Sequence, residues 1–133
     1  MRGALDDAGL ADSAIRYLNL HGTGTPKNDA MECDAVARVF EAPPPTSSTK
    51  PLVGHTLGAA GAMEAGFLWL ALERADASGM SLPPHAYDGV VDDALPALRL
   101  VATGERTTPG PVMSNSFGFG GNNCSLILQR EAA

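Results

Sequence analysis

The sequence predicts one α/β domain with a mixed β-sheet and packed helices. Strand-like and helix-like segments alternate in the first part of the 133-residue chain, which is the order typical of an α/β layer. Three strand-like segments then follow one another near the carboxyl end. Hydrophobic residues make up 44% of the chain and aromatic residues only 5%. The core is therefore expected to be aliphatic and rich in alanine.

The first half of the chain contains one predicted strand and one predicted helix. ALDDAGLADSA has the pattern of a helix end and a loop, and IRYLNL (15–20) is a short strand. The loop HGTGTPKND precedes a helix predicted over 29–40, and EAPPPTSS ends that helix because proline cannot continue it. The apolar residues of this helix recur at the spacing of one face: Met31, Ala35, Val36 and Val39.

The second half adds a longer helix and the end of the sheet. TKPLVGH is compatible with a short strand, and it leads to a helix predicted over 57–75. The first turns of this helix, LGAAGAMEAG, are small enough to let another backbone approach closely. SGMSLPPHAYDGVVDDALPA is expected to be irregular because it is rich in proline and aspartate. Further strands are predicted over 98–103, 111–117 and 123–129, and the glycine turn GFGGN joins the last two.

Composition argues against several classes of function. The net charge of −6 disfavours nucleic-acid binding, which requires clustered lysine and arginine. The most apolar window, residues 59–72, contains Glu64 and is too short to span a bilayer, and no basic amphipathic stretch indicates a membrane surface. The first ten residues do not have the pattern of a secretory signal. The two cysteines form no CxxC motif, so a reducing cytoplasm is predicted.

Two histidines follow short apolar segments and precede small residues, in YLNLHGTGTPKND and STKPLVGHTLGAAG. A histidine in such a turn can donate an N–H to a developing oxyanion while its other nitrogen is held by the backbone. The neighbouring glycines permit tight turns and close approach of a ligand. The alternative is that His21 and His55 each satisfy only the backbone of their own loop.

Other polar residues leave several interpretations open. A metal site is weakly indicated, because the possible ligands His21, Asp29, Glu32 and His55 form no HExxH or similar pattern. His85 lies in the proline-rich segment and is expected at the surface. Glu64 interrupts an apolar helix and needs a partner if it is buried, and Lys50 is one candidate. GFGGNN lacks the spacing of a phosphate-binding loop.

Neither cysteine is in the setting that activates a thiol. Cys33 falls inside a predicted helix and Cys124 inside a predicted strand. A reactive thiolate needs a positive or polar environment that lowers its pKa. Both cysteines are therefore interpreted as small apolar side chains rather than nucleophiles.

Three segments in register resemble a known family. HGTGTPKND, STKPLVGHTLGAAGAME and NSFGFGGNN are similar, in this order and spacing, to the C-terminal half of β-ketoacyl-(acyl-carrier-protein) synthases. The resemblance runs from Met1 to about Gln129 and implies a thiolase-like α/β fold. It also implies that residues 1–133 are the C-terminal half-domain, without its first strand and without the N-terminal half that carries the nucleophilic cysteine. The fold is therefore expected to be incomplete.

The resemblance assigns roles to individual residues. It implies that His21 and His55 bind the malonyl thioester carbonyl and stabilise the enolate formed when carbon dioxide leaves, and that Lys50 orders the site. Phe119 is expected to lend its N–H to the oxyanion hole and its ring to the gate of the acyl site. Glu64, Thr23 and Thr25 are expected to support the site. Some relatives bind a structural cation, for which the matching donors are Asn19, Glu32, Glu64, Ser114 and Asn115.

The implied parent reaction is decarboxylative Claisen condensation of malonyl-carrier protein with an acyl thioester, in fatty-acid or polyketide synthesis. No cofactor is expected beyond the phosphopantetheine arm of the carrier. Expected partners are acyl carrier protein, the missing N-terminal half and a second copy in the full-length protein. Neither Cys33 nor Cys124 matches the family nucleophile, so the chain alone is expected to be inactive. The alternatives are a non-catalytic partner resembling a chain-length factor, and a degenerate fragment.

Overall fold

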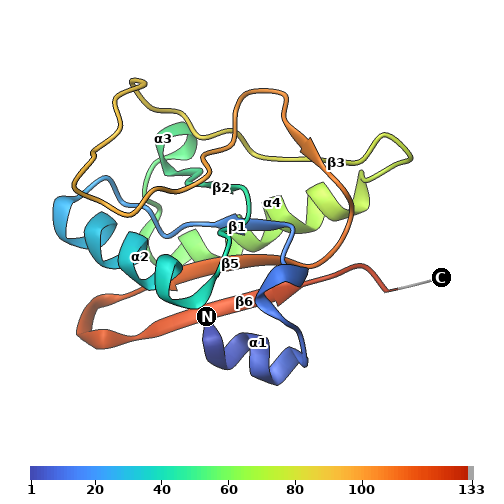
Figure 1. Ribbon diagram of the computed structural model, residues 1–133, viewed down its shortest axis with the longest axis horizontal. Helices are drawn as coiled ribbons and strands as arrows, with labels where there is room; N and C mark the ends of the chain where they lie inside the picture. The colour runs from blue at the N-terminus through green and yellow to red at the C-terminus, as the bar shows by residue number, and fades with distance from the viewer. Residues whose placement is uncertain (132–133) are drawn as a thin grey trace.

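A four-stranded mixed sheet forms the centre of the computed structural model, which describes residues 1–131. The strands lie in the order β2-β1-β5-β6 (Figure 1). Their bounds are β1 (Tyr17–Asn19), β2 (Thr46–Ser47), β5 (Val112–Phe117) and β6 (Asn123–Leu128). Strand β1 pairs parallel with both β2 and β5, whereas β5 and β6 are antiparallel. The predicted mixed sheet is confirmed.

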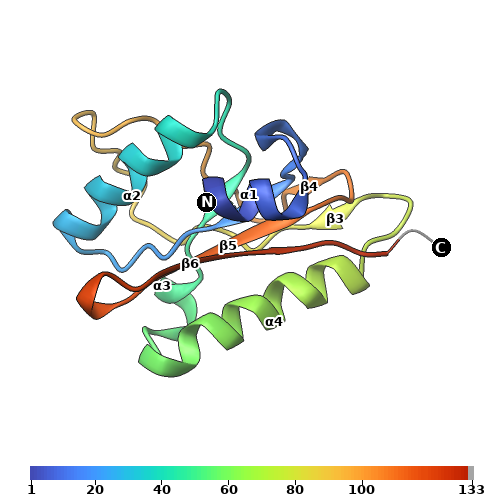
Figure 2. The same cartoon turned by 90° about the horizontal axis from the view of Figure 1, so that it is seen from below.

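Helices cover both faces of this sheet. Figure 2 shows α4 (Ala60–Glu73) along one face, with α1 (Arg2–Ala8) and α2 (Pro26–Val39) on the other. Because side chains alternate along a strand, neighbouring residues of β1 enter different cores. Tyr17 packs in the core on the α4 side, and Leu18 packs with residues of α1 and α2. This alternation also divides the polar residues of the sheet between the two faces.

Helix α2 begins three residues earlier than predicted, at Pro26. Proline suits the first helical position because its fixed φ is helical and its missing N–H needs no partner there. The predicted apolar face is wrong at Met31, which is 45% exposed. The fully buried residues of the helix are Glu32 and Val36. A carboxylate therefore takes a central place on the face where the pattern predicted an apolar residue.

The segment TKPLVGH is not a strand. Residues Lys50–Val53 form the short helix α3, and the strand β2 lies just upstream of them. Pro51 can occupy the first turn of a helix but cannot donate to a sheet ladder. The long helix predicted over 57–75 is confirmed as the 3-10 turn η2 (Leu57–Ala59) followed by α4.

The strand predicted over 98–103 is reduced to a single bridge between Thr46 and Leu100. The amide of Thr46 donates to the Arg99 carbonyl at 2.7 Å, and the amide of Val101 donates to the Thr46 carbonyl at 2.9 Å. Strand β2 has only two residues, so it offers this segment no longer ladder. The segment nevertheless covers the free edge of β2.

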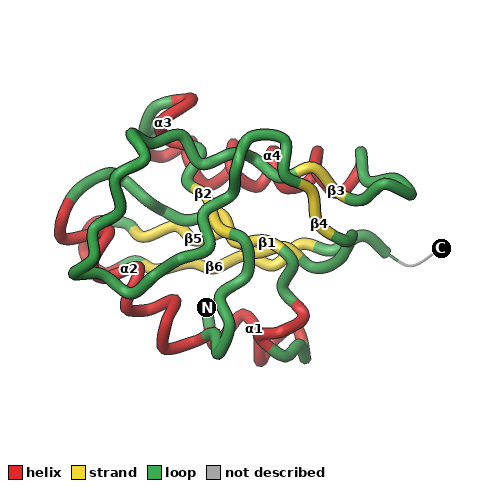
Figure 3. The backbone as a smooth tube through the Cα atoms, turned by 45° about the horizontal axis from the view of Figure 1, so that its top comes forward, coloured by secondary structure: helices red, strands yellow, loops and turns green. Residues whose placement is uncertain are grey.

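A second, two-stranded sheet pairs β3 (Met80–Ser81) with β4 (Arg106–Thr107). Strand β3 lies in the segment expected to be irregular, and Figure 3 shows that most of the chain between β3 and β4 is loop. The turn predicted between the last two strands is the 3-10 turn η3 (Phe119–Gly121). Over the described residues, no helix is both long and apolar enough to cross a membrane.

Candidate active site

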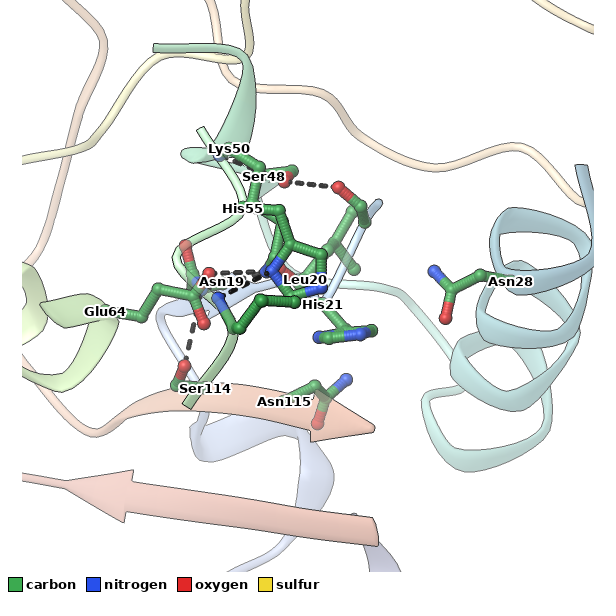
Figure 4. A network of polar contacts seen from close by, with 12 residues as sticks. Asn19, Leu20, His21, Asn28, Ser48, Lys50, His55, Glu64, Ser114 and Asn115 are labelled. Carbon is green, nitrogen blue, oxygen red and sulfur yellow. Dashed lines mark hydrogen bonds and ion pairs between the residues drawn. The ribbon is translucent and has the colours of Figure 1, made fainter. Parts of the chain in front are cut away.

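The two histidines meet beyond the carboxyl ends of β1 and β2. These parallel strands end on the same edge of the sheet, which is where α/β sheets commonly bind ligands. The ring centroids of His21 and His55 lie 5.6 Å apart with an interplanar angle of 86° (Figure 4). Since both residues were expected to bind one thioester carbonyl, the two rings were expected to approach each other. This is confirmed, although they lie 34 positions apart in the chain.

The backbone turn at His21 is held by a buried carboxylate on α2. The amide of His21 donates to Glu32 Oε1 at 2.9 Å, and the amide of Gly22 donates to Glu32 Oε2 at 2.7 Å. The side chain of Asn115 also donates to Glu32 Oε1, at 3.0 Å. Burial raises the pKa of the Glu32 carboxyl, while these three hydrogen bonds lower it. Gly22 has φ of +36°, a conformation that other residues rarely adopt.

Burial and a nearby cation keep His21 neutral. Burial is the larger effect and the charge of Lys50 the next, and together with His55 they lower the pKa of His21 to about 4. The Nδ1 atom of His21 is buried and has no hydrogen-bond partner among residues 1–131. At neutral pH His21 is therefore an uncharged imidazole held in place mainly by its backbone and by packing.

The tautomer of His55 follows from its own loop. The amide of Leu57 donates to His55 Nδ1 at 3.3 Å, so the neutral ring carries its hydrogen on Nε2. Leu57 has φ of +52°, the one positive φ outside glycine among the described residues. Such a conformation is costly for leucine, and it belongs to the turn that places the amide on the ring. His55 itself is exposed, which leaves its N–H donor accessible.

Lys50 and Glu64 form a buried ion pair behind the histidines. The Lys50 Nζ atom lies 2.5 Å from Glu64 Oε1, and both side chains are almost completely buried. The expectation that Glu64 is buried and paired is confirmed, with Lys50 as the partner. The second carboxylate oxygen, Oε2, is buried and has no partner within the part of the chain that the structure describes.

The five donors proposed for a structural cation fall into two groups on opposite faces of the sheet. Asn19, Ser114 and Glu64 lie on the α4 side, where Figure 4 shows Glu64 extending toward the other two. Asn19 Nδ2 lies 3.3 Å from Ser114 Oγ, a long contact for a hydrogen bond. Side chains of this kind can offer oxygen ligands beside the unpaired Glu64 Oε2, and a hard cation prefers oxygen ligands. This group therefore fits the ion that the family resemblance implies.

The other two donors belong to a different network. Both oxygens of Glu32 already accept backbone N–H groups. The Asn115 side chain donates to Glu32 and accepts from Ser125 Oγ at 2.8 Å. Glu32 and Asn115 therefore do not join the cation group. Among residues 1–131, no cluster of three or more His, Cys, Asp or Glu side chains is arranged to hold a metal.

The remaining predicted residues lie at the rim. Thr23 and Thr25 hydrogen-bond to each other through their hydroxyls at 2.9 Å. Phe119 lies in η3 with 94% of its surface exposed. The aromatic ring against His21 is that of Phe117, whose centroid is 5.7 Å away. Sequence reasoning missed Phe117, although the alternation of β5 puts it on the same face as Asn115.

Two further residues escaped the sequence reasoning. Ser48 Oγ donates to the Gly22 carbonyl at 2.7 Å, and the Ser48 amide donates to His85 Nδ1 at 3.1 Å. His85 is thus partly buried against the histidine loop, and the prediction that it lies at the surface is wrong. Only the three-dimensional fold brings these residues to the site.

The surroundings of Cys33 do not activate its thiol. Burial and nearby acidic residues raise the pKa of the Cys33 thiol.

A family comparison decides the assignment. Residues 1–79 match the family described as beta-ketoacyl synthase, C-terminal domain, and this range contains both histidines. The chain belongs to the β-ketoacyl synthase family. The resemblance noted in the sequence is therefore confirmed over more than half of this β-ketoacyl synthase domain.

Curated relatives agree with this assignment. The 3-oxoacyl-[acyl-carrier-protein] synthase 1 of Haemophilus influenzae is 42% identical over 121 residues, which are 90% of this chain and 29% of that protein. The mitochondrial 3-oxoacyl-[acyl-carrier-protein] synthase of Arabidopsis thaliana is 41% identical over 133 residues, covering 96% of this chain and 28% of that protein. The chain thus spans less than a third of either relative.

Solved structures show the same fold. A beta-ketoacyl synthase from Burkholderia phymatum superposes with a TM-score of 0.88 at 41% identity, covering 99% of this chain and 31% of that one. A complex of a ketosynthase with its chain length factor from Xenorhabdus doucetiae gives a TM-score of 0.85 at 49% identity, with 96% and 31% coverage. The predicted thiolase-like fold is confirmed.

Proposed function

We propose that this domain supplies the two-histidine part of a condensing site that joins a malonyl thioester to an acyl thioester. The observation that carries the proposal is the pairing of His21 and His55 at 5.6 Å. His21 is neutral, and His55 presents an N–H because its other nitrogen is occupied. Two N–H donors at one place are suited to bind a single thioester oxygen.

The reaction uses these donors when negative charge develops on that oxygen. Loss of carbon dioxide from the malonyl group leaves an electron pair that delocalises onto the thioester oxygen as an enolate. Hydrogen bonds from His21 and His55 stabilise the enolate, and a preorganised donor of this kind is worth about 3 to 4 kcal/mol. The enolate carbon then attacks the carbonyl of an acyl thioester. A carbon–carbon bond forms, the carbon–sulfur bond breaks and the thiolate leaves.

A low pKa suits His21 to this step. A neutral imidazole donates a hydrogen bond without readily delivering its proton, so the enolate persists long enough to attack. The Lys50 charge contributes to the low pKa of His21, and Glu64 holds Lys50 in place. We assign Lys50 the role of ordering the histidine pair. A cation held by Asn19, Glu64 and Ser114 would balance the second Glu64 oxygen and join β1, β5 and α4.

We also assign the rim residues their family roles. The Phe119 amide completes an oxyanion hole with a backbone amide at the nucleophile, and its exposed ring gates the acyl site. Gly120 and Gly121 follow it with φ of +75° and +82°, conformations that glycine adopts without steric cost. Thr23 and Thr25 flank the entrance used by the pantetheine arm, and no other cofactor is needed.

The nucleophilic cysteine and the partners come from outside residues 1–133 in this proposal. They are the N-terminal half of the synthase, acyl carrier protein and a second copy in the full-length protein. A type II acyl-carrier protein in complex with its ketosynthase has been solved, and one of its chains superposes with a TM-score of 0.86 at 25% identity. Likeness to that complex supports a carrier-protein partner.

A non-catalytic role resembling that of a chain-length factor is the second candidate. Two of the similar solved structures are complexes of a ketosynthase with a chain length factor. The paired donors His21 and His55 favour the catalytic role, because a subunit that does not bind the malonyl carbonyl has no use for two converging N–H groups.

The test combines acylation and condensation. The chain alone is incubated with carrier protein that bears an acyl group, and the intact mass of the chain is measured. The assay is then repeated with malonyl-carrier protein and the N-terminal half of a synthase supplied in trans. We expect no adduct on the chain alone, and condensation only with the added half. His21→Ala or His55→Ala should abolish product, whereas the exposed-cysteine control Cys124→Ala should not.

Two outcomes contradict the proposal. A covalent acyl adduct on the chain alone that disappears in Cys33→Ala or Cys124→Ala would place the nucleophile in this domain. Full condensation activity in both His21→Ala and His55→Ala would remove the histidine pair from the mechanism and favour the second candidate.

A further inference from the structure

Ser48 links, through hydrogen bonds, the turn after His21 to the segment that leads to His55. Its hydroxyl donates to the Gly22 carbonyl at 2.7 Å and accepts from the Lys50 amide at 3.3 Å. It packs so closely that a Cβ on Gly22 would lie 2.6 Å from Ser48 Cβ. Glu32 holds the amides of the same turn. Among residues 1–131, the hydrogen bond to the Gly22 carbonyl comes from Ser48, which therefore fixes the turn after His21 on its carbonyl side.

Ser48 is held in turn by His85, from a distant part of the chain. The Ser48 amide donates to His85 Nδ1 at 3.1 Å, so the hydrogen of the neutral ring is on Nε2. The His85 amide donates to the Val101 carbonyl at 2.9 Å, and the Val101 amide donates to the Thr46 carbonyl at 2.9 Å. The loop that carries His85 is thus fixed to β2 by bonds that do not involve the imidazole.

The His21 ring has few anchors of its own. Its Nδ1 has no hydrogen-bond partner in the described range. Its close aromatic neighbours are the rings of His55 and Phe117, at 5.6 and 5.7 Å. Packing of this kind limits the direction of the ring only loosely. The position of the ring therefore depends on the backbone turn that Ser48 and Glu32 hold.

We propose that Ser48 and His85 are positioning residues that hold the His21–Gly22 turn where the histidine pair can share one oxygen. Neither side chain touches the reacting atoms. A displacement of about 1 Å in a reacting group can cost about 100-fold in rate. The loss of one hydrogen bond outside the site can therefore lower the rate of condensation if it lets the turn move. The effect on rate rests on the proposed function, whereas the effect on the position of His21 can be measured separately.

Two substitutions of His85 form a matched pair. The side-chain oxygen in His85→Asn can take the place of Nδ1 as acceptor for the Ser48 amide. The longer side chain in His85→Gln places its amide near the former Nε2 instead and leaves the Ser48 amide without its acceptor. Both replacements are polar and uncharged, so they differ mainly in this hydrogen bond. Ser48→Ala removes the next link, and Ser78→Ala on the exposed β3 side of the molecule is the control.

The first measurement is NMR of the histidine rings in the ¹⁵N-labelled chain, with folding checked by circular dichroism. We expect Ser48→Ala and His85→Gln to shift the ring signals of His21 and to raise its pKa, because a loosened turn admits water. His85→Asn and Ser78→Ala should leave the signals and the titration unchanged.

The second measurement is condensation with the N-terminal half supplied in trans. We expect Ser48→Ala and His85→Gln to lower kcat by about 10- to 100-fold, with little change in KM because no substrate contact is lost. His85→Asn should retain most of the activity. When the pH falls below the pKa of His85, which burial lowers, protonation of Nδ1 should release the Ser48 amide in the wild type, and this loss should be absent from His85→Asn.

The pH dependence of the wild type must be compared with that of His85→Asn, because other ionisable groups lie near His85. Burial lowers the pKa of His85, and the charge of Asp29 raises it. His85 contacts the Tyr87 ring. It also lines a cavity of about 630 Å³ whose other ionisable groups are Asp29, Glu32, Cys33, Tyr87, Asp88 and Asp92. These groups are present in both proteins, so only the difference between wild type and His85→Asn reports on His85.

The outcomes separate this inference from the proposed function. Unchanged His21 signals in folded Ser48→Ala and His85→Gln would overturn the inference, as would equal damage by His85→Asn and His85→Gln. Shifted His21 signals in a system where even the wild type fails to condense would support the positioning role and overturn the proposed function. Normal condensation by His85→Gln would overturn the positioning role alone.

Discussion

The protonation state of His21 is determined by its surroundings and not by its residue type. Burial, Lys50 and His55 all disfavour the imidazolium, and the result is a pKa of about 4. In an unfolded chain the same histidine titrates near 6.5. Folding therefore selects the neutral ring at any pH above about 4, which is the form that the proposed reaction requires.

The first prediction concerns pH and stability. Between about pH 6.5 and 4 the unfolded chain binds a proton at His21 that the folded chain does not, so this residue makes stability fall as pH falls. The raised pKa of Glu32 acts in the opposite direction. The melting temperature should therefore drop more steeply over this range in the wild type than in His21→Asn. Parallel curves for the two proteins would show that the His21 pKa is not lowered.

The second prediction concerns the two glycines of the His21 loop. Gly22 and Gly24 both have positive φ, but a Cβ would meet Ser48 only at Gly22. Gly24→Ala should cost about 1 kcal/mol of unfolding free energy for its backbone conformation. Gly22→Ala should cost about 2 to 4 kcal/mol, because steric overlap is added to strain. Urea unfolding measures both, and equal losses would mean that Ser48 does not pack against Gly22 as described.

At the scale of elements, the sheet brings together side chains from β1, β5, α3 and α4. Lys50 comes from the first turn of α3, and Glu64 from the second turn of α4, the helix that covers the sheet. Removing one partner of a buried ion pair leaves an uncompensated charge, which is costlier than removing both. The pair therefore couples the position of α3 to that of α4.

The third prediction tests this coupling. Lys50→Met alone or Glu64→Leu alone should lower the free energy of unfolding by about 3 to 5 kcal/mol. The double variant should recover much of that loss, because no buried charge remains. Arg99→Gln, which breaks an exposed pair with Glu105, is the matched control and should cost less than about 1 kcal/mol. Additive losses in the double variant would argue against direct coupling.

The elements show what the sequence could reveal. The sequence predicts strands and helices with a clear period, such as β1, β5, β6 and α4, within a few residues, and the family resemblance predicts that His21 and His55 act together. Glu32 was placed in the cation group, yet it binds the His21 turn. The bridge at Leu100 depends on the length of β2, and the contact of His85 with Ser48 depends on a long loop. No local pattern carries these pairings, because each depends on a distant segment.

At the scale of the whole molecule, the α4 side exposes large apolar side chains. Leu57 in η2 is 67% exposed and Trp69 in α4 is 55% exposed, and Leu52 in α3 is exposed to the same extent as Trp69. Isolated apolar residues are ordinary on protein surfaces. Several on neighbouring elements indicate a surface that associates with another protein. The proposed function identifies the N-terminal half of a synthase as the partner for this surface.

The fourth prediction follows from this surface. The chain alone should self-associate in a concentration-dependent way, as measured by sedimentation velocity. Trp69→Lys should weaken the association, whereas Val90→Lys, on the exposed loop between β3 and β4, should not. Addition of the N-terminal half should compete with self-association. A monomer at all concentrations would contradict the prediction.

Strand β5 carries one further consequence for the whole molecule. Its adjacent residues Ser114 and Asn115 serve opposite faces, the first beside Asn19 and the second beside Glu32. A slip of β5 by a single residue would turn each of them to the wrong face. The proposed cation group and the His21 turn would then be lost in the same event. A misaligned β5 thus forms neither hydrogen-bond network. We therefore expect that inserting or deleting one residue anywhere in the buried part of β5 prevents correct folding.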